Sequence, residues 1–312
     1  MSEGKTYDVI VAGYGPAGVT AGIYGARKRL HIALIGDLPG GEVRNSGDIE
    51  NWPGDQETDG GQLADKLIAH LDDHTDQVDI MSDKVSLITK NDGLFTVETE
   101  AGEPLKGRSI VYATGRHPRM LQVPGEEEFK NKGVSYCATC DAPLFPDKEV
   151  AVIGGGNTGA EAVIMFQNIA KKIYFLHNTD TLAADEILVE NFKDDPKVEI
   201  IYNAMTKKIQ GDAMVEQLVY EDAETKEEKT IDVQGVFVTI GAIPNTDPVK
   251  DMVKLDEFGA VVADRYGKTN VEGFFAAGDV TDIRDAQIVV AAGHGCSALL
   301  SAGDYLSRLP KT

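Results

Sequence analysis

The stretch Tyr7-Asp8-Val9-Ile10-Val11-Ala12-Gly13-Tyr14-Gly15-Pro16-Ala17-Gly18 decides the fold of this chain. Its first half is apolar apart from Asp8, which is typical of a buried parallel strand. A G-x-G-x-x-G loop follows at once, and we expect a helix from Pro16 to about Arg29 and a second strand over 31–35. This order places backbone N–H groups at a pyrophosphate. The stretch therefore predicts a dinucleotide-binding βαβ unit.

The same design recurs in the middle of the chain. Residues 149–153 read as a second buried strand, and the loop Gly154-Gly155-Gly156-Asn157-Thr158-Gly159 follows directly. A helix over about 159–170 and a strand over 172–176 complete the repeat. The 312 residues are long enough for two domains. The second loop predicts either a bound pyrophosphate or only close packing of helix on strand, and the packing interpretation is slightly favoured.

A cysteine pair, Cys137-Ala138-Thr139-Cys140-Asp141, lies between the two glycine loops. Thiols two residues apart close a small disulfide ring that opens at little conformational cost, which suits electron transfer. Asp141 can supply or take a proton during that cycle. A zinc site would need a second pair, and Cys296 is the only other cysteine, so we favour redox chemistry over metal binding. Cys296 itself is expected to be a buried structural thiol near the start of a helix.

Composition restricts the classes of partner. The net charge of −21 argues against nucleic-acid binding, which requires a basic face. No apolar run reaches the length of a membrane span. The N-terminus passes into the first strand without a signal-peptide pattern, so we expect a cytoplasmic protein that does not bind membranes.

The remaining segments give weaker predictions. Asp37 follows shortly after the second expected strand, where an acid often holds a ribose, although it could equally belong to a turn. An apolar stripe predicts a helix over 61–72. Other expected elements are a β meander over 84–113, a strand–hairpin region over 198–233, further strands over 259–280 and a helix over about 292–306.

Taken together, these motifs resemble the low-molecular-weight thioredoxin reductases over essentially the whole chain. The resemblance rests on Gly13 to Gly18, Glu50-Asn51-Trp52-Pro53-Gly54, Ala113-Thr114-Gly115, Cys137 to Asp141, Gly154 to Gly159 and Gly278-Asp279-Val280. It implies an α/β fold of two Rossmann-like, three-layer domains, the second inserted in the first. The FAD-binding domain would comprise 1–116 and 245–312, and the inserted domain, 117–244, would carry the dithiol. A homodimer is also implied.

The resemblance assigns roles to individual residues. Cys140 would take electrons from FAD, Cys137 would attack the disulfide of a thioredoxin or thioredoxin-like partner, and Asp141 would act as acid and base. The implied FAD-binding residues are Gly13, Gly15, Pro16, Ala17, Gly18, Asp37, Gly41, Glu42, Asn51, Thr114, Gly115, Gly278, Asp279, Gln287 and Ile288. Asp279 would precede a helix and accept from a ribityl hydroxyl. Glu42 stands where the family usually has Gln. A second nucleotide would lie on Gly154, Gly156 and Gly159.

The electron donor departs from the family pattern. NADPH-dependent members carry His-Arg-Arg and a further Arg after the strand that follows the second glycine loop, whereas this chain reads His177-Asn178-Thr179-Asp180-Thr181-Leu182-Ala183. Asp180 would repel a 2′-phosphate. We therefore expect NADH, reduced ferredoxin or reduced deazaflavin as donor rather than NADPH. Two alternatives are a flavin-dependent dithiol oxidase that uses O₂ and a non-catalytic, redox-sensing flavoprotein.

Overall fold

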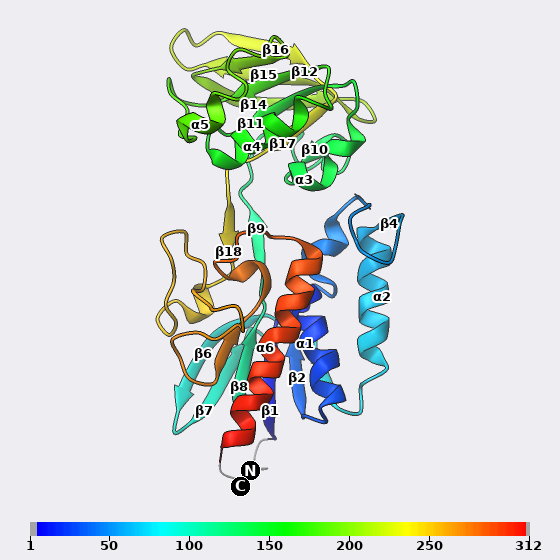
Figure 1. The fold of residues 1–312 in the computed structure, drawn as a ribbon, viewed down its shortest axis with the longest axis vertical. Helices are drawn as coiled ribbons and strands as arrows, with labels where there is room; N and C mark the ends of the chain where they lie inside the picture. Colours follow the sequence, from blue (N-terminus) through cyan, green and yellow to red (C-terminus); the bar gives the residue numbers. More distant parts are fainter. Residues whose placement is uncertain (1–4, 310–312) are drawn as a thin grey trace. The chain divides into compact units, whose positions relative to one another are not determined.

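Residues 5–309 are described by a computed structural model, and the chain forms two units (Figure 1). The first unit joins residues up to His117 with those from Ile243 onward, and the second is Pro118–Ala242. The connecting segments β9 (Arg116–Pro118) and β18 (Ala242–Pro244) pair with each other. The second unit is therefore an insertion within the first. Within residues 5–309, no helix is long and apolar enough to cross a membrane.

The first unit is built on a mixed sheet with strand order β5-β2-β1-β8-β7-β6, and β19 also pairs with β8. Strands β5, β2, β1, β8 and β19 are parallel, while β6 and β7 are antiparallel additions. The strands are β1 (Thr6–Ala12), β2 (Ile32–Ile35), β5 (Val78–Met81), β6 (Val85–Asn91), β7 (Leu94–Thr99), β8 (Leu105–Tyr112) and β19 (Phe274–Ala276); β3 (Asp48–Ile49) and β4 (Thr58–Asp59) form a separate pair. The helices are α1 (Pro16–Arg27), α2 (Gly60–Asp72) and α6 (Ile288–Arg308), with 3-10 turns η1 (Gly41–Asn45), η3 (Asp247–Val249) and η4 (Gly278–Val280).

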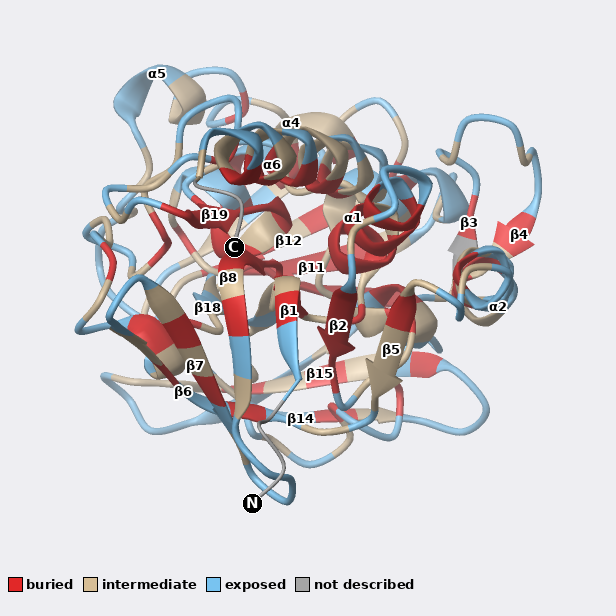
Figure 2. Ribbon diagram, turned by 90° about the horizontal axis from the view of Figure 1, so that it is seen from below, coloured by how far each residue is buried: buried red, intermediate tan, exposed pale blue. Residues whose placement is uncertain are grey.

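Both faces of this sheet are covered. On one face, the buried sides of α1 and α6 turn toward the strands (Figure 2). On the other face, Val249, Val253 and Val261 pack with residues of β6, β7 and β8. Continuous apolar strands such as β1 follow from this double burial, because neither face meets water. The carboxyl ends of β1, β8 and β19 thereby share one edge, which is where ligands bind in such sheets.

The second unit also has three layers. A fully parallel sheet of order β10-β17-β11-β12-β13 is covered by α4 on one face and by the antiparallel sheet β14-β15-β16 on the other. Its strands are β10 (Val134–Ser135), β11 (Glu149–Ile153), β12 (Lys172–Leu176), β13 (Val198–Ile201), β14 (Ala204–Gly211), β15 (Val215–Asp222), β16 (Glu228–Asp232) and β17 (Gly235–Val238). Its helices are α3 (Ala138–Asp141), α4 (Asn157–Phe166) and α5 (Glu186–Val189), with the 3-10 turn η2 (Ala142–Leu144). The predicted α/β class is confirmed.

Three helix boundaries differ from expectation. Helix α1 ends at Arg27 rather than near Arg29, because Arg29 adopts a left-handed φ of 60° and the Leu30 N–H closes the end on the Gly25 carbonyl. Helix α4 begins two residues before Gly159 and ends at Phe166. Helix α6 begins at Ile288, four residues before the expected start.

The prediction of strands over 259–280 was largely wrong. Only β19 is a strand there, and the rest is loop held by isolated bridges such as Val261 with Thr281. Two aspartates explain the difference. Asp256 Oδ1 accepts from the Phe258 and Ala260 N–H groups, and Asp264 Oδ1 accepts from Tyr266 and Lys268. Such local side-chain bonds compete with a sheet ladder.

Candidate redox site and cofactor cradle

Cys137 and Cys140 form a disulfide whose Cα atoms lie 5.3 Å apart. Cys137 caps the short helix α3, and its Sγ accepts a hydrogen bond from the Cys140 N–H at 3.2 Å. Cys140 is exposed and Cys137 is half-buried. Neither cysteine is buried in the core of the second unit.

Asp141 is held beside the dithiol by Ser135, a residue that the sequence analysis missed. The Ser135 hydroxyl donates to Asp141 Oδ2 at 2.5 Å and accepts from the Cys137 N–H at 3.1 Å. Ser135 ends strand β10 and is only 6% exposed. In the sequence, Ser135 stands out only as a small polar residue directly after the apolar Val134.

In the first glycine loop, two of the three motif glycines are needed for packing. A Cβ at Gly13 would lie 2.1 Å from the Ala113 carbonyl oxygen, and one at Gly18 would lie 1.9 Å from the Gly13 oxygen. At Gly15 the nearest atom is the Gly41 Cα at 3.7 Å. No side chain caps α1, which begins at Pro16. Space and free helix N–H groups therefore coincide at Gly15, as a pyrophosphate requires.

Several other expected residues lie against this loop. A Cβ at Gly41 would lie 2.7 Å from the Gly15 Cα, and one at Gly278 would lie 3.1 Å from the Ala17 Cβ. Asp37 is exposed and follows Gly36, whose Cβ position is 2.6 Å from the Tyr14 Cβ. The structure thus brings the first loop together with Asp37, Gly41 and Gly278.

A second group lies at the start of α6. Gln287 is the N-cap residue of this helix, and its Oε1 accepts from Asn51 Nδ2 at 3.3 Å. Ile288 packs on the small cluster of Val43, Ile49 and Leu63, which Trp52 also contacts. Asn51 and Gln287 therefore meet although they are far apart in the sequence. Glu42 lies in η1 with an exposed side chain, and its expected flavin contact stays a prediction.

Thr114 and Gly115 are fixed by Asn245, which the sequence analysis did not single out. The Asn245 side chain donates to the Thr114 carbonyl at 2.8 Å, and the Thr114 hydroxyl donates to the Asn245 carbonyl at 2.9 Å. The Asn245 N–H donates to the Gly115 carbonyl at 3.0 Å. A Cβ at Gly115 would meet no atom within 4 Å, so its left-handed φ of 67° and not crowding accounts for glycine.

Asp279 lies in the 3-10 turn η4, and the helix that it was expected to precede, α6, begins only at Ile288. Residues 281–287 separate this turn from α6, because the Thr281 N–H and hydroxyl both bond the Gly278 carbonyl and end the turn. Arg116 Nε lies 3.9 Å from Asp279 Oδ2. Burial raises the pKa of Asp279, and Arg116 opposes this rise. A carboxylate so desolvated gains most from a hydroxyl donor.

The second glycine loop repeats the first in detail. Gly13 and Gly154 both have φ of 121°, and a Cβ at Gly159 would lie 1.9 Å from the Gly154 oxygen. At Gly156, however, a Cβ would meet nothing within 4 Å. Helix α4 begins at the next residue without a side-chain cap. Packing therefore explains Gly154 and Gly159 but leaves Gly156 unexplained.

The segment after β12 folds onto this loop. The Gly155 N–H donates to His177 Nδ1 at 3.1 Å, and the Gly155 carbonyl accepts from the Ala183 and Ala184 N–H groups. Burial lowers the pKa of His177, which keeps Nδ1 free to accept. Asn157 Nδ2 donates to Asp185 Oδ2 at 3.0 Å. His177 thus braces the loop, a contact that no sequence pattern indicated.

Cys296 lies within α6 and is half-buried, not buried near a helix start. Its thiol lies beside the Tyr24 hydroxyl on α1 and raises the pKa of Tyr24. The side chain therefore faces the α1–α6 seam near the surface, away from the sheet core that would bury it.

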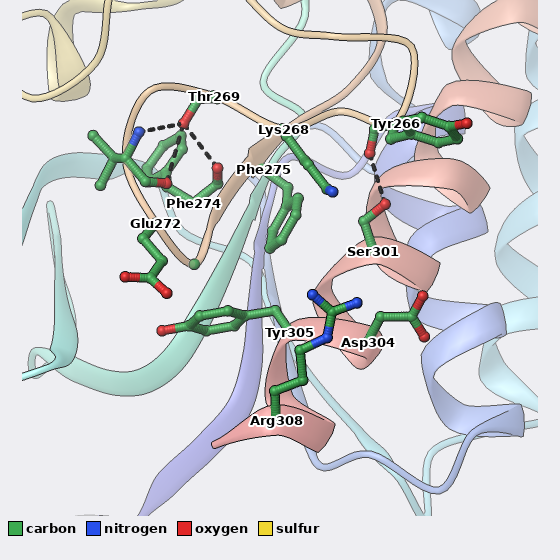
Figure 3. A pocket seen from close by; sticks show the side chains of 12 residues that line it. Tyr266, Lys268, Thr269, Glu272, Phe274, Phe275, Ser301, Asp304, Tyr305 and Arg308 are labelled. Atoms are coloured by element: carbon green, nitrogen blue, oxygen red, sulfur yellow. Dashed lines mark hydrogen bonds between the residues drawn. The ribbon is translucent and has the colours of Figure 1, made fainter.

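A separate cavity of about 430 Å³ opens between β19 and the C-terminal half of α6 (Figure 3). The Ser301 hydroxyl donates to the Tyr266 carbonyl at its wall. The lining residues are Tyr266, Lys268, Thr269, Val271, Glu272, Gly273, Phe274, Phe275, Ser301, Asp304, Tyr305 and Arg308. None of them is an expected site residue, so the cavity is distinct from the expected cofactor site around Gly15, Gly41 and Gly278.

The fold and these sites define a class: a thioredoxin reductase-like flavoprotein oxidoreductase. The thioredoxin reductase of Streptococcus pyogenes superposes with a TM-score of 0.92 at 35% identity, covering 97% of this chain and 99% of that one. The thioredoxin reductase of Giardia duodenalis superposes with a TM-score of 0.91 at 29% identity, covering 97% and 99%.

The family follows from the sequence comparisons. The model of the pyridine nucleotide-disulphide oxidoreductase family matches residues 7–295, and this chain belongs to that family. An NADH dehydrogenase of Bacillus subtilis is 42% identical over 99% of this chain, and an alkyl hydroperoxide reductase component of Staphylococcus aureus is 42% identical over 97%. The chain spans 60% of the length of these two relatives. FAD is the cofactor, and the open cradle at Gly15 with the uncapped α1 fits it.

Proposed function

We propose that this protein passes electrons from NADH, through FAD and the Cys137–Cys140 dithiol, to the disulfide of thioredoxin or a thioredoxin-like protein. The observation that carries the proposal is the accessible Cys137–Cys140 disulfide with Asp141 held beside it, in the same unit as a glycine loop that borders free space. The proposal assigns FAD to the first unit and includes the homodimer that the resemblance implies. Light scattering of the holoprotein tests the dimer.

The first unit would hold FAD through two kinds of contact. The α1 N-terminus and Gly15 would receive the pyrophosphate, since backbone N–H groups and free space meet there. Asp37 would accept from a ribose hydroxyl at the end of β2, and Asp279 from a ribityl hydroxyl. When bound, FAD supplies two-electron exchange between a nicotinamide and a disulfide.

The thiols would divide the work at the partner. After reduction, Asp141 takes the proton of the Cys137 thiol, the Cys137 thiolate attacks one sulfur of the partner disulfide, and the other partner sulfur leaves with that proton. Cys140 then attacks Cys137, the bond between Cys137 and the partner breaks, and the Cys140 proton passes to the departing partner sulfur. The partner gains the two electrons and two protons that the dithiol loses, so the enzyme returns to its disulfide form.

The donor assignment rests first on Gly156. Packing requires the other glycines of the second loop but leaves Gly156 facing open space, as it leaves Gly15 almost open in the first. The open space at Gly156 and the uncapped start of α4 support a bound dinucleotide over packing alone.

Charge then separates NADH from NADPH. Residues 177–192, which follow β12, contain no Lys or Arg but include Asp180, Asp185, Glu186 and Glu190. A 2′-phosphate at the end of this strand would meet acids instead of guanidinium groups. The name of the Bacillus subtilis relative, NADH dehydrogenase, supports the same donor.

Anaerobic mixing of the oxidised holoprotein with each donor tests this proposal. We expect NADH to bleach the flavin absorption band at concentrations at least about tenfold below those needed for NADPH. Faster bleaching by NADPH would contradict the donor assignment. Bleaching only by reduced ferredoxin or deazaflavin would mean that electrons do not enter from a nucleotide bound at Gly156. Reduction by a small dithiol, with turnover only in O₂, would favour a dithiol oxidase.

A further inference from the structure

We propose that Ser135 is a positioning residue that keeps the Asp141 carboxylate ionised and aimed at the dithiol, and so sets the acid limit of thiol exchange. The inference rests on the proposed function for its biological meaning. Its chemical content concerns only Ser135, Asp141 and Cys137, and it can be measured without a donor or a protein partner.

The hydrogen-bond arrangement fixes where the serine proton goes. A hydroxyl has one proton to donate. The Ser135 oxygen already accepts from the Cys137 N–H at 3.1 Å, which orients the hydroxyl. Of its two acceptors, Asp141 Oδ2 lies at 2.5 Å and the Cys137 carbonyl at 3.4 Å. The shorter contact to an ionised oxygen is the stronger one.

Burial makes this contact hard to replace with water. Ser135 is 6% exposed and pairs with Phe237 across the parallel strands β10 and β17. The hydroxyl therefore has a fixed origin in the sheet, while the acid it holds lies at the end of a helix of four residues. Such a short helix has little rigidity of its own, so the strand supplies the precision.

The chemical consequence concerns the proton that Asp141 exchanges with the thiols. A hydrogen bond donated to a carboxylate stabilises its ionised form. Without Ser135, the Asp141 carboxylate would lose this donor, would keep its proton to higher pH and would be oriented less firmly toward the dithiol. Both effects lower the rate at which Cys137 reacts on the acid side of the pH profile, while the alkaline side changes little.

The test uses the FAD-loaded protein in a Cys140→Ser, Cys296→Ser background, so that Cys137 is the sole thiol. Its alkylation by iodoacetamide is followed between about pH 5 and pH 9, a range that spans ordinary carboxyl and thiol titrations. We expect Ser135→Ala to move the acid-side inflection of the alkylation rate upward by about one pH unit, which corresponds to about tenfold tighter proton binding by Asp141. Ser135→Thr, which keeps a hydroxyl, should restore the profile. Asp141→Asn should remove the inflection.

Ser109→Ala is the matched control. Ser109 is also buried and donates to a backbone carbonyl, but it lies in the other unit. Its alkylation profile should superpose on that of the parent. If Ser135→Ala does not fold, Ser135→Gly replaces it. A profile of the folded Ser135 variant that superposes on the parent would overturn the inference.

The two proposals fail separately. If the acid-side inflection shifts but no donor drives thioredoxin reduction by the parent protein, the proposed function is wrong and the role of Ser135 stands. If thioredoxin is reduced normally and the inflection does not shift, the role of Ser135 is wrong and the proposed function stands.

Discussion

Single glycines distinguish binding from packing in this protein. Gly15 and Gly156 have extended backbone angles that any residue adopts, and little or nothing would touch a Cβ there. A Cβ atom at Gly18 or at Gly159 would instead lie 1.9 Å from a backbone oxygen. The same Gly→Ala change therefore has opposite meanings at neighbouring positions of one loop.

We predict that Gly15→Ala lowers FAD affinity at least about tenfold and Gly156→Ala does the same for NADH, each with an unchanged melting temperature of the cofactor-free protein. Gly18→Ala and Gly159→Ala should instead lower that melting temperature, because the backbone must move. Flavin titration, NADH titration and thermal unfolding measure these effects. An unchanged FAD affinity in Gly15→Ala would contradict the assignment of the FAD pyrophosphate to Gly15 and the α1 N-terminus.

Asp279 is expected to lower the stability of the cofactor-free protein and to strengthen FAD binding. Because burial raises its pKa, the folded protein holds this proton to higher pH than the unfolded chain, and the ionised form costs stability above that range. Asp279→Asn should therefore raise the melting temperature of the cofactor-free protein at pH 7 and lower its flavin content. The stability difference should vanish below about pH 4, where the unfolded carboxyl is protonated. Asp37→Asn, at an exposed acid of the same cradle, should lower flavin retention without the stability gain.

At the scale of elements, the segment between β12 and α5 is expected to set the choice of nucleotide. Asn178 and Asp180 are exposed, and neither the loop brace at His177 nor the Asn157–Asp185 pair involves their side chains. We predict that Asn178→Arg with Asp180→Ala raises kcat/KM for NADPH about tenfold, since one charge-assisted hydrogen bond contributes about 1.5 kcal/mol. Steady-state kinetics with both nucleotides measures the change.

The control for that variant changes the charge equally elsewhere. Thr230→Arg with Glu228→Ala alters two exposed residues of β16, in the antiparallel sheet of the same unit. Its NADPH kinetics should match the parent. An equal gain in both variants would mean that net charge, rather than a local phosphate contact, governs NADPH use.

The elements also show what the sequence can predict. The units β1–α1–β2 and β11–α4–β12 were found correctly, because apolar runs and glycine loops are local signals. The contacts of Ser135 with Asp141, His177 with Gly155 and Asn245 with Thr114 were missed. They depend on sheet register and loop closure, which join positions that no local pattern connects. The prediction of strands over 259–280 was wrong for a local reason: the Asp256 and Asp264 side chains bind nearby backbone N–H groups, which forms turns where the apolar pattern predicted strands.

At the scale of the whole molecule, each unit carries one histidine that accepts a glycine N–H beside a proposed cofactor loop. His177 Nδ1 accepts from Gly155, and His294 Nδ1 accepts from Gly278 at 3.1 Å. Burial lowers the pKa of both histidines. Protonation at Nδ1 would break each bond, so the two units share one acid-sensitive feature.

We therefore predict that stability falls on acidification below about pH 6.5. The unfolded chain binds protons at these histidines near that pH, whereas the folded chain binds them only at lower pH, so the unfolded state gains protons first. Thermal unfolding against pH measures the decline. His177→Asn and His294→Asn offer an amide oxygen as acceptor without a titrating group, and should flatten it. An unchanged pH dependence in the double variant would assign the decline to other groups.

Electron transfer out of the protein through the dithiol can be tested directly. NADH-reduced protein is mixed anaerobically with oxidised thioredoxin, and the flavin absorption band is followed for the wild type, Cys140→Ser and Cys296→Ser. We predict that the band returns in the wild type and in Cys296→Ser, with two thioredoxin dithiols formed per flavin, because the reduced flavin and the reduced dithiol together hold four electrons. Cys140→Ser should be reduced by NADH and stay bleached. Return of the band in Cys140→Ser at the wild-type rate would show that electrons leave by a route other than the dithiol.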